Sequence, residues 1–339
     1  MIATRARRWM VRGWRRRVLV AGTCAAIALN AVAFMQARAM VSWSEGAERT
    51  RGPEELSTLE RIGVLVTGIQ VPRPTNARTP ADVGLEFDGA SFDSASGARL
   101  AAWVLPADPA LDRGVVVLCF HGYAAARASL LERAAVLHEL GCTCVLVDFF
   151  GSGDSTGTGT TIGVREAYDV AAAVEFARHR FDGAPLVLFG NSMGAAAVLR
   201  AAGRLGLGSG ERAVQGLALE GCFDTLGNTT AQRFHSMGLP AWPLAPLLVM
   251  WGGVAADIDG FDHRPVDDAG SVTAPTLMIH AADDRRVTED QARALLEALG
   301  GWTRFALVPG AEHDRSFEKD PERWRAGFDA LLTHVLANG

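Results

Sequence analysis

A serine between two glycines has the sequence environment of an activated nucleophile. Gly190-Asn191-Ser192-Met193-Gly194 follows the apolar run 186–189 and precedes a stretch rich in alanine. The pattern is G-x-S-x-G at a predicted strand-to-helix turn, where glycines tolerate a sharp backbone and the serine hydroxyl stands clear of it. The start of the following helix also favours negative charge that develops nearby. We therefore predict that Ser192 is a nucleophile.

A serine hydroxyl near neutral pH needs a neighbouring base, and that base needs a group to orient it. His313 lies in a glycine-containing loop after the apolar run 305–308, and Asp284 follows the apolar run 276–279. The order Ser192, Asp284, His313 is the one expected of a hydrolase with this serine turn. We predict His313 as the base and Asp284 as the acid. By spacing alone Asp283 competes directly with Asp284, and Asp224 is a third option.

An acyl-transfer site also needs two N–H donors for the oxyanion of the tetrahedral intermediate. The backbone of Met193, the residue after the nucleophile, is the first predicted donor. The second is expected in the loop after the apolar run 115–120, which reads His121-Gly122-Tyr123. We predict the Tyr123 N–H as that donor, with His121 bracing the loop.

The surrounding sequence alternates between strand-like and helix-like segments. The runs 115–120 and 142–147 are continuously apolar, as in strands covered on both faces, and 85–92 and 99–105 form a predicted hairpin. Further strands are expected at 186–189, 214–219, 276–279 and 305–308, and helices at 128–140, 164–179, 193–205, 288–299 and 322–336. In the helix 164–179, Val164, Tyr168, Ala171 and Val174 form the predicted buried stripe. This alternation predicts an α/β fold with a mainly parallel sheet.

One segment, 223–270, interrupts that alternation. It contains Trp242 and Trp251 and is too apolar for a loop, but Pro240, Pro243 and Pro246 break it too often for one helix. We predict a small helical lid at the carboxyl edge of the sheet, where ligands bind in such folds. An additional packing layer is the alternative.

The N-terminus has the pattern of a membrane segment. Seven arginines lie within residues 5–17, and no charged side chain occurs from 18 to 37, a length that can cross ~30 Å of hydrocarbon as a helix. We predict a basic flank at 1–17, a transmembrane anchor or signal segment at 18–40 and a proline-rich connector at 41–82. The basic flank places the arginines in the cytoplasm and the remaining chain in the periplasm or outside the cell. A cleaved signal peptide, with Ala37-Arg38-Ala39 as its cleavage site, is the alternative to an uncleaved anchor.

Composition and motif searches exclude other classes of function. The net charge of −5 argues against nucleic-acid binding, and no G-x4-G-K-[ST], H-E-x-x-H or correctly placed G-x-G-x-x-G occurs. The five cysteines form no metal motif, and those in apolar runs are expected in the core. We expect no cofactor, no metal and no nucleic-acid partner.

Several motifs together resemble the α/β-hydrolase superfamily, in particular the serine-aminopeptidase-like and lipase-like bacterial hydrolases. They are Leu118-Cys119-Phe120-His121-Gly122, the segment 147–155, the Ser192 turn, His280-x3-Asp284-x2-Val287 and Gly310-Ala311-Glu312-His313. The resemblance covers about residues 85–337 and implies an eight-stranded sheet. It also favours Asp284 over Asp283. Ala281 stands where the family usually has glycine. The anchor and connector resemble membrane-tethered bacterial members.

These observations predict an α/β-hydrolase domain at 83–339, with its lid at about 223–270, tethered to the inner (cell) membrane. The predicted activity is hydrolysis of a carboxylic ester through an acyl-enzyme, because esters have good leaving groups. The substrate would be a small-molecule or lipid-like acyl compound. Peptide or amide cleavage is the alternative enzyme activity, since selectivity depends on lid and pocket. A catalytically silent, membrane-tethered binding protein is the alternative from another class.

Overall fold

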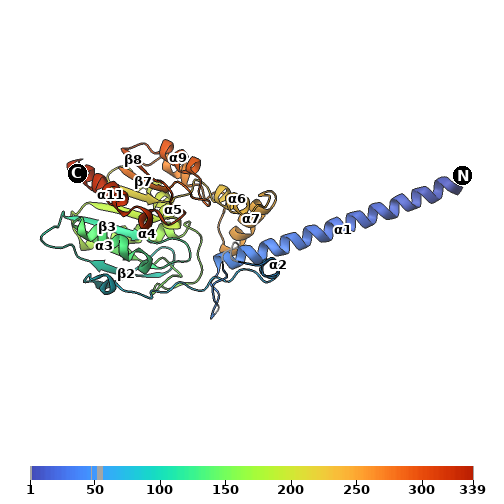
Figure 1. Cartoon of the computed structure of the whole chain (residues 1–339), viewed down its shortest axis with the longest axis horizontal. Coiled ribbons are helices and arrows are strands. Elements are labelled where there is room, and N and C mark those ends of the chain that lie inside the picture. Colours follow the sequence, from blue (N-terminus) through green and yellow to red (C-terminus); the bar gives the residue numbers. More distant parts are fainter. Residues whose placement is uncertain (1, 47, 52–55, 339) are drawn as a thin grey trace.

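The central sheet positions every other element of the catalytic domain. The computed structural model describes residues 2–46, 48–51 and 56–338 (Figure 1). Met1 is the first residue of the predicted flank and Gly339 the last of the predicted hydrolase domain, and both lie outside the described residues. The strands are β1 Asp88–Asp93, β2 Arg99–Leu105, β3 Val115–Phe120, β4 Cys142–Val147, β5 Leu186–Asn191, β6 Gly216–Glu220, β7 Thr276–Ala281 and β8 Thr303–Val308. Their order is β1-β2-β4-β3-β5-β6-β7-β8 in a single eight-stranded sheet of the described chain.

Six of these strands are parallel. The pairs from β4 through β8 run in the same direction, whereas β1 with β2 and β2 with β4 are antiparallel. The predicted hairpin is confirmed, although its first strand begins at Asp88 rather than at residue 85. The parallel strands place their carboxyl ends at one edge, where loops from β3, β5, β7 and β8 can converge.

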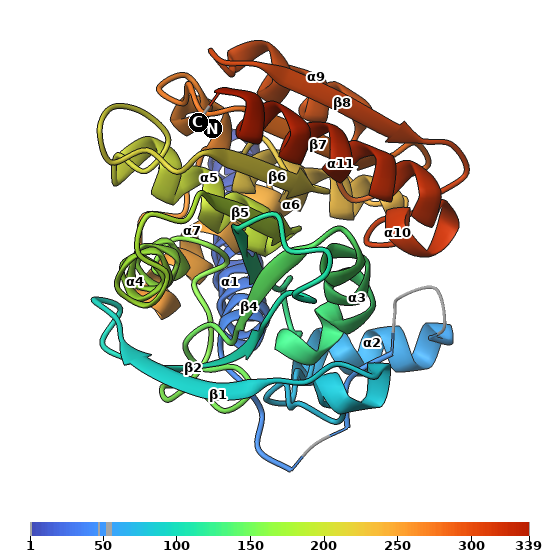
Figure 2. The ribbon, with the colours of Figure 1, turned by 90° about the vertical axis from the view of Figure 1, so that its left-hand side faces the viewer.

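Helices cover both faces of the sheet, which explains why its central strands are apolar throughout. Alternate side chains of β3 point to opposite faces, with Leu118 in one core cluster and Cys119 in the other. The first cluster packs under α4 Glu166–Arg180, α5 Met193–Arg204, α8 Pro265–Ala269 and α9 Glu289–Ala298. The second packs under α3 Leu131–Glu139 and α11 Pro321–Asn338, with the short α10 Ser316–Lys319 beside them. Figure 2 shows α4 and α3 on opposite sides of the sheet.

The predicted buried stripe of helix α4 is wrong at Tyr168, which is 43% exposed, but correct at Val174, which is buried. Val174 shares the buried face with Ala167, Val170, Ala173 and Ala177. Two carboxylates, Glu166 and Asp169, are also buried on this helix. Asp169 accepts hydrogen bonds from the hydroxyls of Ser94 and Ser96 and from the backbone of Phe150. Small residues and satisfied carboxylates therefore form the packed face, and the tyrosine faces outward.

The N-terminal segment is one long helix, α1 Ile2–Val41, that leaves the domain as a single rod (Figure 1). The predicted basic flank and apolar run belong to this helix. The connector that follows contains α2 Thr58–Thr67, whose first turn is closed by a capping box between Ser57 and Glu60. Arg73 then donates to the carbonyls of Gly153 and Gly157 and tethers the connector to the loop after β4.

The segment predicted as a lid contains α6 Leu226–Ser236 and α7 Leu244–Ala256, followed by α8. In the sequence this segment follows β6, so it begins at the carboxyl edge of the sheet. In Figure 1, α6 and α7 lie on the side of the domain from which α1 projects. The cysteines are free, four of them buried and Cys24 exposed.

Candidate active site

Ser192 lies at a strained turn between β5 and α5. Its φ of 51° and ψ of −113° are conformations that a side chain other than glycine rarely adopts. A Cβ on Gly190 would lie 2.5 Å from Ala195 N, and one on Gly194 would lie 2.4 Å from Phe120 O. Neither glycine can therefore be replaced without moving the backbone. The Ser192 N–H donates to Glu220 O at 2.7 Å, which ties the turn to β6.

His313 connects Ser192 to Asp284. Its Nε2 lies 2.9 Å from Ser192 Oγ, and its Nδ1 lies 2.5 Å from Asp284 Oδ2. These distances assign the Nδ1–H tautomer, in which Nδ1 donates to the carboxylate and Nε2 accepts from the serine hydroxyl. The three residues come from loops after β5, β7 and β8. The structure thus brings them into one hydrogen-bonded row.

The environment of this row favours a charged pair. Burial alone would raise the pKa of Asp284, but the hydrogen bond from His313 and those from the Val287 and Arg286 N–H groups hold it below its usual value. Burial alone would lower the pKa of His313. The nearby Asp314 carboxylate and the bond to Asp284 instead raise it. The imidazolium that forms when His313 takes a proton is therefore stabilised.

Of the three carboxylates that the sequence offers, only Asp284 hydrogen-bonds to His313 in the structure. Asp283 is exposed. Asp224 accepts hydrogen bonds from Thr225 N and Asn228 Nδ2 at the start of α6, so it supports the lid segment.

The loop after β3 lies directly against the nucleophile. A Cβ built on Gly122 would be 3.5 Å from Ser192 Cβ and 2.9 Å from Asn191 Oδ1, so only glycine fits there without displacement. In the described part of the chain, neither the Tyr123 nor the Met193 backbone N–H donates to another loop, turn or cap. Met193 follows Ser192 directly at the start of α5, and Tyr123 follows Gly122 in the loop that contacts the serine.

His121 has a bracing position in this loop. It is fully buried; its Nε2 accepts from Phe149 N at 3.1 Å, and its Nδ1 donates to Gly122 O at 2.9 Å. Burial lowers its pKa, so the ring is neutral. The bond from Phe149 N joins this loop to the segment after β4, whereas the bond to Gly122 O lies within the loop.

Two acidic residues near the site were not foreseen. Asp314 has a φ of 60°, and its Oδ2 lies 3.5 Å from His313 Nε2, on the side of the ring that faces Ser192. Its Oδ1 is buried without a hydrogen-bond partner in the described chain. Only its position beside His313 could have indicated it from the sequence.

Glu220 is the second, at the end of the apolar strand β6. Arg133 donates two hydrogen bonds of 2.9 Å to its carboxylate, and Trp324 Nε1 donates a third at 3.1 Å. Because its backbone carbonyl accepts from Ser192, this buried ion pair fixes the strand end beside the nucleophile. A glutamate closing an apolar run was the signal that could have found it.

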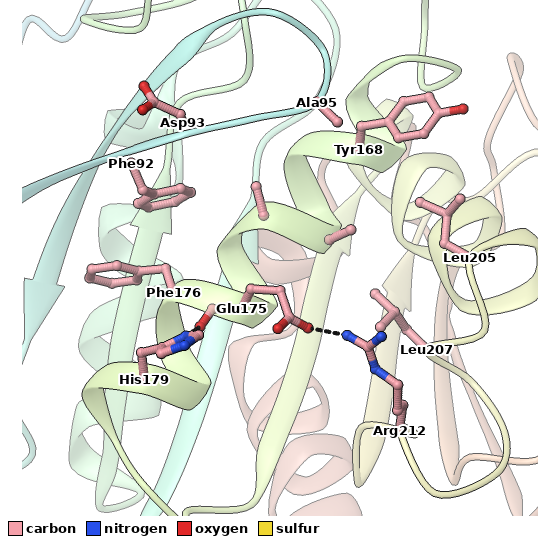
Figure 3. A pocket seen from close by; sticks show the side chains of 12 residues that line it. Phe92, Asp93, Ala95, Tyr168, Glu175, Phe176, His179, Leu205, Leu207 and Arg212 are labelled. Atoms are coloured by element: carbon pink, nitrogen blue, oxygen red, sulfur yellow. Dashed lines mark hydrogen bonds and ion pairs between the residues drawn. The ribbon is translucent and has the colours of Figure 1, made fainter.

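A separate hollow lies away from this site. It has a volume of about 600 Å³ between β1 and α4, and none of the three row residues lines it. Figure 3 shows Phe92 over Phe176 on one side and the Glu175–Arg212 ion pair on the other. In the described chain no group of three or more His, Cys, Asp or Glu side chains could hold a metal ion.

Comparison with known proteins agrees with this arrangement. The family model described as serine aminopeptidase, S33, matches residues 112–239. An uncharacterized protein of Mycobacterium tuberculosis is 30% identical over 233 residues, which are 68% of this chain and 72% of that protein. The chain belongs to the α/β-hydrolase superfamily. The protein YfhR of Escherichia coli, also uncharacterized, is 26% identical over 234 residues, 68% of this chain and 74% of its own length.

Solved α/β-hydrolase structures share the fold. The Pyrococcus furiosus esterase Pf2001 superposes with a TM-score of 0.60 at 20% identity and covers 78% of this chain and 98% of its own. The Exiguobacterium antarcticum esterase EaEST gives 0.53 at 20% identity, with 73% and 99% covered. The recognised superfamily and the predicted fold class are thereby confirmed.

The N-terminal helix is a candidate membrane span. In the described residues, Trp14–Val41 is the one helix both long and apolar enough to cross a bilayer. Length and composition alone fit either an anchor or a signal sequence.

Proposed function

We propose that the protein is a serine hydrolase that cleaves a carboxylic ester through an acyl-enzyme. The observation that carries the proposal is the Ser192–His313–Asp284 row, with distances of 2.9 and 2.5 Å, starting from a strained serine turn. A silent binding protein has no need to hold a serine in such a conformation.

The reaction has two halves, acylation of Ser192 and hydrolysis of the acyl-enzyme, and His313 transfers the proton in both. Ser192 Oγ attacks the acyl carbon while His313 Nε2 takes its proton, and Asp284 holds the tautomer and stabilises the imidazolium. The Met193 and Tyr123 N–H groups donate to the oxyanion of the tetrahedral intermediate. His313 then protonates the departing alcohol. A water attacks the acyl-enzyme with His313 again as base, which releases the acid and restores the Ser192 hydroxyl.

Ester cleavage is the first choice because an alkoxide leaves more readily than an amine. Cleavage of a peptide or amide by the same residues is the second candidate, and the serine aminopeptidase description of the matching family model favours it. A panel of p-nitrophenyl esters of graded chain length, compared with aminoacyl-p-nitroanilides, separates the two. We expect kcat/KM to be higher for the esters, and the reverse preference would make the protein a peptidase.

The same panel tests the nucleophile. Ser192→Ala removes the group that attacks, so ester turnover should fall by about 10^4-fold or more. Ser129→Ala, on an exposed serine whose hydroxyl donates to Ala126 O, is the control and should retain turnover. Undiminished turnover by Ser192→Ala would refute the proposal.

We further propose that α1 anchors the protein in the cell membrane, with the catalytic domain in the periplasm or outside the cell. Support comes from the packing of its last turns. Ala33, Ala37 and Val41 are buried, and the Met40 carbonyl accepts from Tyr123 Oη at 2.7 Å. Cleavage after Ala39 would remove the buried Ala33 and Ala37 and would leave Met40 as a new N-terminus. A reporter fused after Gly339 tests the orientation; activity only in the cytoplasm would contradict it.

A further inference from the structure

The second lid helix, α7, has the composition of a membrane-inserted element. No charged side chain occurs from 237 to 256, a stretch that includes the whole of α7. Large apolar side chains on this stretch remain open to the surroundings, with Trp242 80% and Val254 61% exposed. Exposed large apolar side chains gathered on one short segment are typical of an interaction site.

Helix α7 packs on α1 inside the apolar run. Trp251 Nε1 donates to Asn30 Oδ1 at 3.1 Å, and the Trp251 ring meets Phe34 edge-on at 5.4 Å. Nearer the domain, a Cβ on Gly252 would lie 3.9 Å from Ala37 Cβ. The small residues of α7 thus allow the two helices to approach closely.

The length of α1 fixes the depth of these contacts in a bilayer. At 1.5 Å per residue the uncharged run 18–37 extends about 30 Å, the thickness of the hydrocarbon. If the hydrocarbon ended where α7 begins to cover α1, only 18–29 would remain, about 18 Å. Moving the span toward the N-terminus would instead bury Arg15, Arg16 and Arg17 in lipid. With 18–37 spanning the hydrocarbon, the contact of Trp251 with Asn30 would lie about 10 Å inside its boundary, and Gly252, beside Ala37, would lie near that boundary.

The last turn of α1 also contacts the loops that carry the predicted oxyanion donors. The Met40 carbonyl accepts from Tyr123 Oη, and the Val41 carbonyl accepts from Thr160 N at 3.0 Å. Thr160 Oγ1 in turn lies 3.4 Å from the Met193 sulfur. A small apolar cavity of about 40 Å³ lies between α1, α7 and the loop at Ile162. Met40 and Val41, which line this cavity, thus contact Tyr123 directly and Met193 through Thr160.

We propose that α7 is embedded beside α1 in the bilayer leaflet next to the catalytic domain, and that the substrate is an acyl ester resident in that leaflet. The first part rests on the proposed membrane anchor, and the second rests in addition on the proposed hydrolase function. The ester reaches Ser192 along the seam between α7 and α1, so its acyl chain need not cross water.

A spin label measures the depth of the lid directly. In full-length protein with Cys24→Ala, a nitroxide is attached at Val254→Cys or, as control, at Leu111→Cys. Leu111 is 51% exposed and precedes β3, at the edge of the sheet opposite the site. In vesicles of phosphatidylcholine and phosphatidylglycerol, we expect the label at 254 to collide more with oxygen than with a water-soluble nickel chelate. The label at 111 should show the reverse. Nickel-accessible label at 254 would overturn the inference.

Two esters with one leaving group test the substrate class. The ratio of hydrolysis of vesicle-borne 4-methylumbelliferyl oleate to soluble 4-methylumbelliferyl butyrate is compared among variants. Val254→Asp opposes insertion of the lid, so its ratio should fall about tenfold or more, while Leu111→Asp should keep the wild-type ratio. An unchanged ratio in Val254→Asp would refute delivery from the leaflet.

These results separate the failure of this inference from failure of the proposed function. If the wild type hydrolyses neither ester, the proposed hydrolase function and the substrate class fall together, and the spin label still decides where the lid lies. If both esters are hydrolysed but the label at 254 faces water, the hydrolase stands and the embedded lid is wrong.

Discussion

At Ser192 the backbone conformation determines where the hydroxyl points. A φ of 51° turns the hydroxyl out of the β5–α5 turn and toward His313, and the glycines on either side leave room for that turn. The hydrogen-bonded row of Ser192, His313 and Asp284 was predictable from the sequence, because the types, order and placement of these residues after apolar runs are restrictive. Spacing alone could not decide whether Asp283 or Asp284 is the acid. The side chains of two adjacent residues point in different directions, and spacing does not tell which of them points toward His313.

The two neighbouring aspartates give the first prediction. Asp284→Asn should lower kcat by about 10^4-fold, because an amide favours the wrong tautomer of His313. Asp283→Asn, one residue away and exposed, is the matched control and should retain activity. Steady-state ester kinetics on both proteins provide the measurement. Equal losses in both variants would remove Asp284 from its assigned role.

Asp314 gives a prediction about pH. His313 acts as base only when neutral, so activity falls as pH drops through its pKa, which burial lowers and Asp314 then raises. Asp314→Asn removes that stabilisation of the imidazolium, and the acid limb of kcat/KM should move to lower pH. Asparagine also tolerates the positive φ at this position.

Glu312→Gln, an exposed carboxylate on the other side of His313, is the control and should leave the acid limb in place. If the acid limb of kcat/KM in Asp314→Asn keeps its pH position or moves to higher pH, Asp314 does not raise the pKa of His313. The role of Asp314 was not predictable, because it depends on a loop conformation that no local pattern specifies.

Among the elements, α4 shows where sequence periodicity fails. The apolar side chains Val164 and Tyr168 suggested one face, but the helix packs through alanines and through buried carboxylates. The donors to Asp169 come from the β1–β2 turn and from the loop after β4, far away in the sequence. Periodicity treats a carboxylate as exposed when its partners are unknown. In α4, tertiary hydrogen bonds hold carboxylates in the buried face, so the observed face of the helix differs from the expected one.

Stability measurements on α4 follow from this packing. Asp169→Ala leaves the Ser94, Ser96 and Phe150 donors without their acceptor, so the free energy of unfolding should fall by about 3 kcal/mol. Tyr168→Ala on the exposed face should change it by no more than about 0.5 kcal/mol. Urea denaturation in detergent measures both. A greater loss in Tyr168→Ala would restore the face that periodicity favoured.

For the whole molecule, the relation between α1 and the catalytic domain is the feature that the sequence left open. Hydropathy predicts a membrane segment, but a cleaved signal and a retained anchor have similar sequences. Packing favours the proposed anchor, because Phe34 of α1 contacts Trp251 of α7. The Met40 carbonyl, which accepts from Tyr123 Oη, lies beyond the predicted cleavage site. Such contacts join positions more than eighty residues apart, which no local pattern contains.

Retention of α1 is therefore an expected property of the mature protein. Intact-mass measurement of protein purified from membranes should include residues 1–41, and alkaline carbonate should not extract the protein. A mature mass that begins near Met40 would identify the segment as a signal peptide and would contradict the anchor.

The account depends most on an activated hydroxyl at residue 192. Incubation with a fluorophosphonate, followed by peptide mass spectrometry, should place one phosphonyl adduct on Ser192, with no adduct in Ser192→Ala and slow labelling in His313→Ala. Folded, full-length protein that hydrolyses esters while Ser192 stays unmodified, or that carries the adduct on another residue, would contradict it.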